Sequence, residues 1–163
     1  MKHFIIFLFL VLLIGCTTTG MKGTEGLGDD KLSVIWLHQD IITPFRVKSL
    51  NGEGVRQAFL AKIKDVPGKK IMVIELWHTY VENGTSAKSK FQFDLEFNSK
   101  PGYSYNFKLK NGDYSVVSKD VEVCVLEEQH DAIGSSVNYT GEFRVPSKNA
   151  AEIFCAKGRS VPI

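Results

Sequence analysis

Histidine and carboxylate side chains are the groups of this chain best suited to metal binding or acid–base chemistry. Three histidines, His38, His78 and His130, lie beyond the N-terminal segment, and no two of them stand at a spacing typical of metal ligands. The densest polar cluster is Glu-Glu-Gln-His-Asp at residues 127–131, which could hold a divalent cation or act as acid and base. We interpret it as a solvated loop after a strand, and we predict no metal and no cofactor. His130 is retained as a candidate contact for a partner.

Nucleophilic catalysis requires a serine or cysteine in a recognisable setting. The chain has no Gly-x-Ser-x-Gly motif. Ser135 and Ser136 follow Gly134 near His130, but their spacing does not support a catalytic triad. We therefore predict no catalytic residue and a non-enzymatic protein.

Aromatic side chains could form a stacking surface for sugars or peptides. The candidates are Trp36, Trp77, Tyr80, Tyr103 and Tyr105. Aromatic residues at alternating strand positions are more often part of a core. Tyr80, close to an expected hairpin tip, is the best candidate for an aromatic contact with a partner.

The N-terminus has the composition of a secretory signal. A short basic start precedes the apolar residues 4–14, too few to cross a hydrocarbon layer of about 30 Å, which takes about 20 residues. The segment ends in Leu13-Ile14-Gly15-Cys16, which resembles the lipobox of bacterial lipoproteins. The resemblance implies removal of residues 1–15, a diacylglyceryl group on the Cys16 sulfur and a fatty acyl chain such as palmitate on its amino group. Because Thr17 and not aspartate follows Cys16, it also implies sorting to the outer membrane, with the protein facing the periplasm.

Two cysteines remain once Cys16 carries lipid. An even number in an oxidising periplasm predicts a disulfide between Cys124 and Cys155. The alternative is two buried free thiols, since unpaired cysteine is often a core residue.

The charge balance limits the partners that can be expected. The formal net charge is +2, which argues against nucleic acid, because nucleic-acid binding requires a clustered basic face. The expected contact with a membrane is the lipid anchor, because no segment after Cys16 is long and apolar enough to span a bilayer.

The composition divides the chain into three parts. Residues 1–15 are the expected signal peptide. Residues 16–30 are rich in glycine and threonine and predict a lipidated cysteine followed by a flexible tether outside the fold. Residues 31–163 are expected to form one domain.

Alternation of apolar and polar residues predicts strands through most of that domain. Residues 91–98 and 103–110 alternate on either side of a Lys-Pro-Gly turn, and the short connection suggests an antiparallel pair. Residues 70–80 are apolar on both faces, which is typical of a central strand covered on both sides. Residues 82–85 predict a hairpin tip. In a strand over residues 120–127, Val121, Val123 and Val125 should face inward and Cys124 outward, so that a disulfide would hold the C-terminal tail over the outside of the strand.

The remaining segments are less regular. Residues 31–37, 45–50 and 137–145 predict strands, and residues 51–52 a turn. Residues 55–65 fit either a helical stripe or a strand, and we favour the strand. A short C-terminal helix is indicated over residues 150–157. The predicted fold is all-β: a single antiparallel β-sandwich of seven to eight short strands.

The turns and alternating strands also carry a family resemblance. The stretch from Val66-Pro67-Gly68 to residue 73, residues 91–98, and Lys100-Pro101-Gly102-Tyr103 together resemble the PEGA-like β-sandwich domains of bacterial envelope lipoproteins. The similarity covers roughly residues 31–127. These are turn and core signals, so the resemblance implies a fold and an accessory or surface-binding module.

Three classes of function follow from these features. The first is a non-enzymatic lipid-anchored protein that binds or supports an envelope partner, either a protein assembly or peptidoglycan. The second is a small disulfide-stapled inhibitor or ligand-binding protein that presents residues 127–137 to its target. The third is a periplasmic hydrolase, which would require a pocket joining His130 or His78 to a carboxylate and a hydroxyl group.

Overall fold

The computed structural model describes residues 18–36, 45–55, 62–82, 84–110, 121–130 and 147–163. Apart from the short 3-10 helix η1 (Asp29–Lys31), the regular elements of these residues are strands. They are β1 (Thr18–Gly20), β2 (Ser33–Trp36), β3 (Phe45–Leu50), β4 (Glu53–Gly54), β5 (Lys62–Asp65), β6 (Gly68–Glu82), β7 (Thr85–Ser99), β8 (Tyr103–Leu109), β9 (Glu122–Gln129), β10 (Ala151–Lys157) and β11 (Arg159–Val161).

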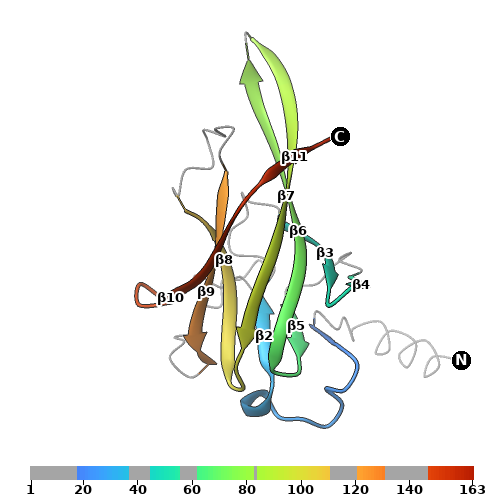
Figure 1. Cartoon of the computed structure of the whole chain (residues 1–163), viewed down its shortest axis with the longest axis vertical. Coiled ribbons are helices and arrows are strands. Elements are labelled where there is room, and N and C mark those ends of the chain that lie inside the picture. Colours follow the sequence, from blue (N-terminus) through green and yellow to red (C-terminus); the bar gives the residue numbers. More distant parts are fainter. Residues whose placement is uncertain (1–17, 37–44, 56–61, 83, 111–120, 131–146) are drawn as a thin grey trace, which may run out of the picture.

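The strands form two sheets (Figure 1). In the described part of the chain one sheet has the order β1-β5-β2-β8-β9-β10 and the other the order β11-β7-β6-β3-β4. Neighbouring strands are antiparallel except in the pairs β1–β5 and β2–β8. The prediction of an all-β sandwich is confirmed.

The core lies between the two sheets and is built from alternating positions. In β7, Phe91, Phe93, Leu95 and Phe97 are buried, while Asp94 and Glu96 between them are exposed, as the period of two predicts. The core also takes in alternating residues of β3, β6, β8 and β9, including Val123 and Val125, together with Val121 just before β9. The inward positions predicted for these three valines are confirmed.

The expected pairing of the strands around the Lys-Pro-Gly turn is wrong. β7 pairs with β6 and β11, whereas β8 pairs with β2 and β9 in the other sheet. The turn therefore carries the chain across the sandwich, and the two apolar faces meet across the core. The rings of Phe97 and Tyr105 lie 5.2 Å apart between centroids. Alternation is the same for strands that lie side by side and for strands that face each other, so it could not distinguish the two arrangements.

The prediction that β6 is covered on both sides is also wrong. Met72, Ile74 and Leu76 are buried, but Ile71, on the other face, is 49% exposed. Val73 and Trp77 on that face are half-buried. β6 is a central strand of its sheet and is fully covered on its inner face only.

Both ends of the described chain differ from expectation. The segment expected to be a tether contains β1, which pairs with β5, and η1, which packs beneath the turn at Gly102. The segment expected to be a helix is β10, which pairs with β9 because its Phe154 and Ala156 pack against the core at a spacing of two. Of the strand expected over residues 55–65, β5 covers residues 62–65, and residues 56–61 lie outside the described residues. The strand expected over residues 137–145 also lies outside them.

The chain passes from β5 to β6 through a tight turn that also joins the two sheets. Lys70 Nζ lies 2.7 Å from Asp65 Oδ2, and both side chains are almost fully buried. The other carboxylate oxygen of Asp65 accepts the amide of Val66 at 2.9 Å, and Lys70 also donates to the Val66 carbonyl. Ser33 donates to the Asp65 carbonyl at 3.0 Å. These polar contacts hold the two ends of the turn between β5 and β6 together.

A third crossing joins β10 to β11 at Gly158. A Cβ atom at this position would lie 2.7 and 2.9 Å from two ring carbons of Phe93 and 3.3 Å from the Val121 carbonyl oxygen. The Gly158 amide donates to that same oxygen at 2.7 Å. The position therefore requires glycine because the chain approaches the core too closely for any side chain.

We expect Gly158→Ala to lower the free energy of unfolding by about 1–3 kcal/mol, because the added methyl group overpacks the Phe93 ring. Urea unfolding measures the change. Gly54→Ala is the matched control, since the atom nearest to its Cβ is the Lys48 carbonyl oxygen at 4.0 Å. Equal stability of the two variants would contradict the packing argument.

The predicted disulfide is confirmed: Cys124 and Cys155 are bonded, with a sequence separation of 31. The two cysteines are directly opposite each other in the β9–β10 register. β10 therefore lies beside β9 in the same sheet, and not over its outer face as expected. The bond fixes the strand that leads to the Gly158 crossing.

Replacing both cysteines by serine should lower the free energy of unfolding by about 3–4 kcal/mol, because the unfolded chain regains the entropy of a closed loop. Urea unfolding of the oxidised protein and of the double variant measures this loss. The reduced wild-type protein should match the double variant. A double variant as stable as the oxidised protein would show that β10 does not depend on the bond.

Candidate functional site

The two candidate partner contacts, Tyr80 and His130, lie toward opposite ends of the molecule. Tyr80 is in the upper part of the hairpin of β6 and β7, two residues before its closing pair, Glu82 with Thr85. His130 follows β9 at the other end, where its amide donates to the Gly102 carbonyl at 2.7 Å. The hairpin alone spans 15 residue pairs, about 50 Å at 3.3 Å per residue. The two residues cannot belong to a single site.

The hairpin extends well beyond the rest of its sheet (Figure 1). On one side, β3 pairs with β6 as far as Leu76, and on the other, β11 pairs with β7 from Gln92 to Lys90. Beyond these positions, residues 78–82 and 85–89 pair with each other and with no other described strand. The predicted tip is confirmed, with Gly84 in the positive-φ conformation that a two-residue turn requires.

This extension combines strand-forming and small residues. Thr79, Tyr80 and Val81 favour β structure, and Ser86 and Ala87 in the opposite strand are small. A two-stranded hairpin is at best marginally stable in water, because it lacks a further layer to bury its side chains. An extension of this length is suited to contact with another molecule.

The base of the extension is braced by an aromatic side chain between two cations. Trp77 lies on the outer face of the five-stranded sheet, with the Arg46 guanidinium 5.5 Å and the Lys90 ammonium 5.2 Å from its ring centroid. Lys90 also lies 3.7 Å from the carboxylate of Glu75, which is buried. The contacts link β3, β6 and β7 at the level where the hairpin leaves the sandwich.

At the other end of the sandwich, His130 joins a hydroxyl and a carboxylate. Its Nδ1 lies 3.1 Å from Ser104 Oγ, and its Nε2 lies 4.0 Å from Asp29 Oδ2. Asp29 in turn pairs with Lys64 at 2.5 Å. The hydrogen bond from Lys64 lowers the pKa of the Asp29 carboxyl, so the carboxylate form is favoured.

The order of groups resembles a serine–histidine–aspartate relay, but its geometry does not provide a reactive nucleophile. Ser104 is 0% exposed, so a substrate cannot reach its Oγ atom. The distance of 4.0 Å between His130 and Asp29 exceeds that of a hydrogen bond. These contacts join Asp29 of η1 and Lys64 of β5 to Ser104 of β8 and to His130, which follows β9.

The acidic residues expected on a loop lie in β9. Glu127 accepts hydrogen bonds from Tyr105 at 3.0 Å and Lys100 at 2.7 Å. Burial raises the pKa of the Tyr105 hydroxyl, which stays protonated and donates. The hydrogen bond to Glu127 raises the pKa of Lys100. The loop interpretation of residues 127–129 is wrong because each side chain has a partner in β8 or next to it.

Glu128 is buried on the outer face of the same sheet. It accepts Asn106 Nδ2 at 3.3 Å and the Ser147 amide at 3.0 Å. The Oδ1 atom of Asn106 is buried and has no hydrogen-bond partner among the described residues. Residues 131–137, the rest of the loop expected to present an inhibitory contact, lie outside the described residues.

Among the described residues, the one group of potential metal ligands consists of Cys124, Glu152 and Cys155. The two sulfur atoms are bonded to each other and cannot act as thiolate ligands. His38 lies outside the described residues, as do Cys16 and Ser135. No helix within the described ranges is long and apolar enough to cross a membrane.

Comparison of the chain with protein-family models, with curated proteins and with solved structures finds no match. The resemblance to PEGA-like domains and to lipoproteins therefore stays a prediction.

Sequence reasoning missed Asp29 and Ser104 as partners of His130. No local signal could have indicated them, because the serine lies 26 residues and the aspartate about 100 residues away in sequence. It also missed the length of the hairpin, although residues 68–99 contain no turn signal other than residues 82–85.

We expect Asp29→Asn to lower the free energy of unfolding at pH 7 by no more than about 1 kcal/mol, because the pair with Lys64 is partly exposed. Since folding lowers the pKa of Asp29, its contribution is present above the unfolded-state value of 3.8. It is lost as the pH falls through the lower, folded-state value. The two proteins should therefore converge in acid.

Urea unfolding between pH 7 and pH 3 tests the convergence. Asp30→Asn is the control, since the exposed Asp30 side chain forms no hydrogen bond or ion pair within the described structure. A difference that persists unchanged into acid would rule out the charge as its cause.

Proposed function

We propose that this protein is a non-enzymatic, lipid-anchored envelope protein at the periplasmic side of the outer membrane. It acts as a binding or accessory module, and the extended hairpin, residues 78–89, is its contact with a partner. The observation that carries the proposal is the extension of two strands beyond every other described strand of the sandwich.

The position of β1 supports this arrangement. Thr18, two residues after the expected lipid attachment at Cys16, pairs with Lys62, three residues before the end of β5. β6 starts at Gly68, on the other side of the turn that follows β5, and Glu82 lies 14 residues farther along β6. At about 3.3 Å per residue, the hairpin tip lies roughly 35 Å farther along the strand direction than Thr18. The anchored part of the molecule and the hairpin are thus well separated.

The backbone of the extension favours a protein partner. Both of its strands have an edge without a described neighbouring strand, and such edges pair with extended segments of other chains. Peptidoglycan is the other partner compatible with the proposal.

Deleting residues 78–81 together with 86–89 tests the hairpin as the contact. The deletion removes four paired positions from each strand, so Glu82 and Thr85 still close the turn on the same face of the sheet. We expect the shortened protein to fold, to stay in the membrane fraction and to lose its partner. Crosslinking in intact cells, followed by mass spectrometry of the membrane fraction, measures the partner.

A photo-crosslinking residue provides the matched comparison within the full-length chain. Placed at Tyr80, it should yield a crosslinked product that is absent when it replaces Lys48, an exposed residue of β3. Products from position 48 with none from position 80 would place the contact elsewhere. Recovery of the same partner by crosslinking of the shortened protein in intact cells would do so as well. A product containing glycan fragments would identify peptidoglycan as the partner.

A further inference from the structure

The distance between the expected lipid and the folded protein is very short. Cys16 precedes Thr18, the first residue of β1, by two positions. An extended residue spans at most about 3.6 Å, so the fold begins within about 7 Å of the acylated residue. β1 is held in the six-stranded sheet by three register pairs with β5. A tether as long as residues 16–30 would have allowed a much larger separation.

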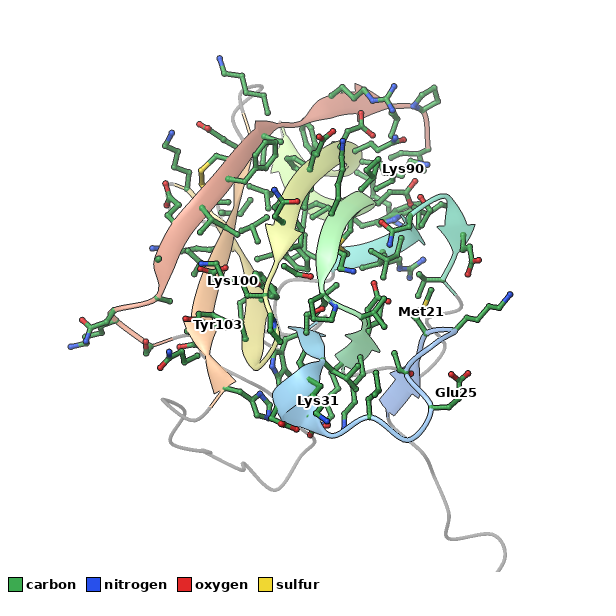
Figure 2. All side chains as sticks on the ribbon, turned by 60° about the horizontal axis from the view of Figure 1, so that its bottom comes forward. Met21, Glu25, Lys31, Lys90, Lys100 and Tyr103 are labelled. Atoms are coloured by element: carbon green, nitrogen blue, oxygen red, sulfur yellow. A yellow bond between two sulfur atoms is a disulfide. The ribbon has the colours of Figure 1, made fainter. Side chains whose placement is uncertain are left out.

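The residues after β1 form a compact loop at the same corner of the sandwich. The amide of Thr24 donates to the Met21 carbonyl and that of Leu27 to the Thr24 carbonyl, both at 3.2 Å. The Glu25 carboxylate accepts the Gly23 amide at 2.9 Å. Figure 2 shows Met21 and Glu25 on this loop where it leaves β1. The loop is therefore ordered by its own turns.

Two exposed aliphatic side chains lie at this corner, Leu27 at 40% and Val66 at 37% exposure. The Cβ position of Gly23 is 3.9 Å from a methyl group of Val66, which places the turn between β5 and β6 against the loop. In the same segment of the chain as Leu27, Lys22 and Lys31 are exposed, and so are Glu25 and Asp30. Because these charges balance, apolar contact rather than net charge would have to attract this corner to a surface.

We propose that this corner, residues 18–28 with Val66, rests on the lipid surface, with Leu27 and Val66 inserted among the headgroups. The inference rests on the proposed lipid anchor. A lipid surface is the fitting occupant because the chain length from Cys16 brings it within reach, and aliphatic side chains flanked by lysine suit a membrane interface. In this arrangement the sandwich lies directly on the membrane surface, and the hairpin extends to a fixed distance from that surface in a fixed direction.

The test uses the full-length lipidated protein in vesicles of phosphatidylethanolamine and phosphatidylglycerol. Leu27→Cys is labelled with an environment-sensitive fluorophore, and Ile153→Cys, on the far edge strand β10, is the matched control. Ile153 is 37% exposed, close to the 40% of Leu27. The native cysteines do not interfere, since Cys124 is bonded to Cys155 and the Cys16 sulfur carries the lipid.

At position 27 we expect a blue-shifted emission and several-fold weaker quenching by iodide than at position 153. Label at Val66→Cys should behave like that at position 27. Vesicle-bound protein with equal, water-like emission at all three positions would overturn the lipid contact and leave the anchor intact. Protein that fails to float with vesicles, and whose N-terminal peptide shows no lipid mass, would overturn both proposals.

Discussion

The buried ion pair between Asp65 and Lys70 is the interaction on which the arrangement of the two sheets most depends. The chain must leave the six-stranded sheet and start the five-stranded one within a few residues, and the turn that does so is flanked by the buried side chains of Asp65 and Lys70. Asp65 and Lys70 bond the backbone of Val66 as well as each other. Removing one partner would leave a buried charge without compensation, a loss of about 3–5 kcal/mol in other proteins. The register of β6 with β7 starts directly after this turn, at Gly68 and Ser99.

Two other crossings between the sheets lie wholly within described residues, and each uses a different physical means. Between β7 and β8, the Tyr105 hydroxyl accepts the Lys100 amide and donates to Glu127, so one phenol ties the turn to β9. Between β10 and β11, packing alone sets the path, because Gly158 lies against the Phe93 ring. Polar contacts hold the first two crossings, whereas a steric requirement and a nearby disulfide hold the third. Together they keep two sheets face to face with a core rich in phenylalanine.

The local pattern of residues predicted much of the fold and little of the candidate site. Residues 45–50 and 91–97 alternate strongly, and β3 and β7 follow that alternation. The positions of Cys124 and Val125 on opposite faces followed from the same period of two. The turn after Ser99 could not be assigned to a crossing, because its residues are compatible with a hairpin as well. Contacts such as His130 with Ser104 depend on the register of β8 with β9, for which a single sequence contains no signal. β1 could not be predicted for another reason. Its three residues have no large apolar side chain, and they pair with β5 at the edge of the sheet through backbone hydrogen bonds.

The parallel pairing of β1 with β5 has a mechanical consequence. A pull on the chain from its N-terminal side acts along the axis of β1, and the hydrogen bonds to β5 run across that axis. The load falls on the three register pairs at once, in shear, instead of opening them one after another as in the peeling of a hairpin from its end. Force arriving through Thr18 thus passes to β5 and, through the turn that Asp65 and Lys70 close, into the long strand β6.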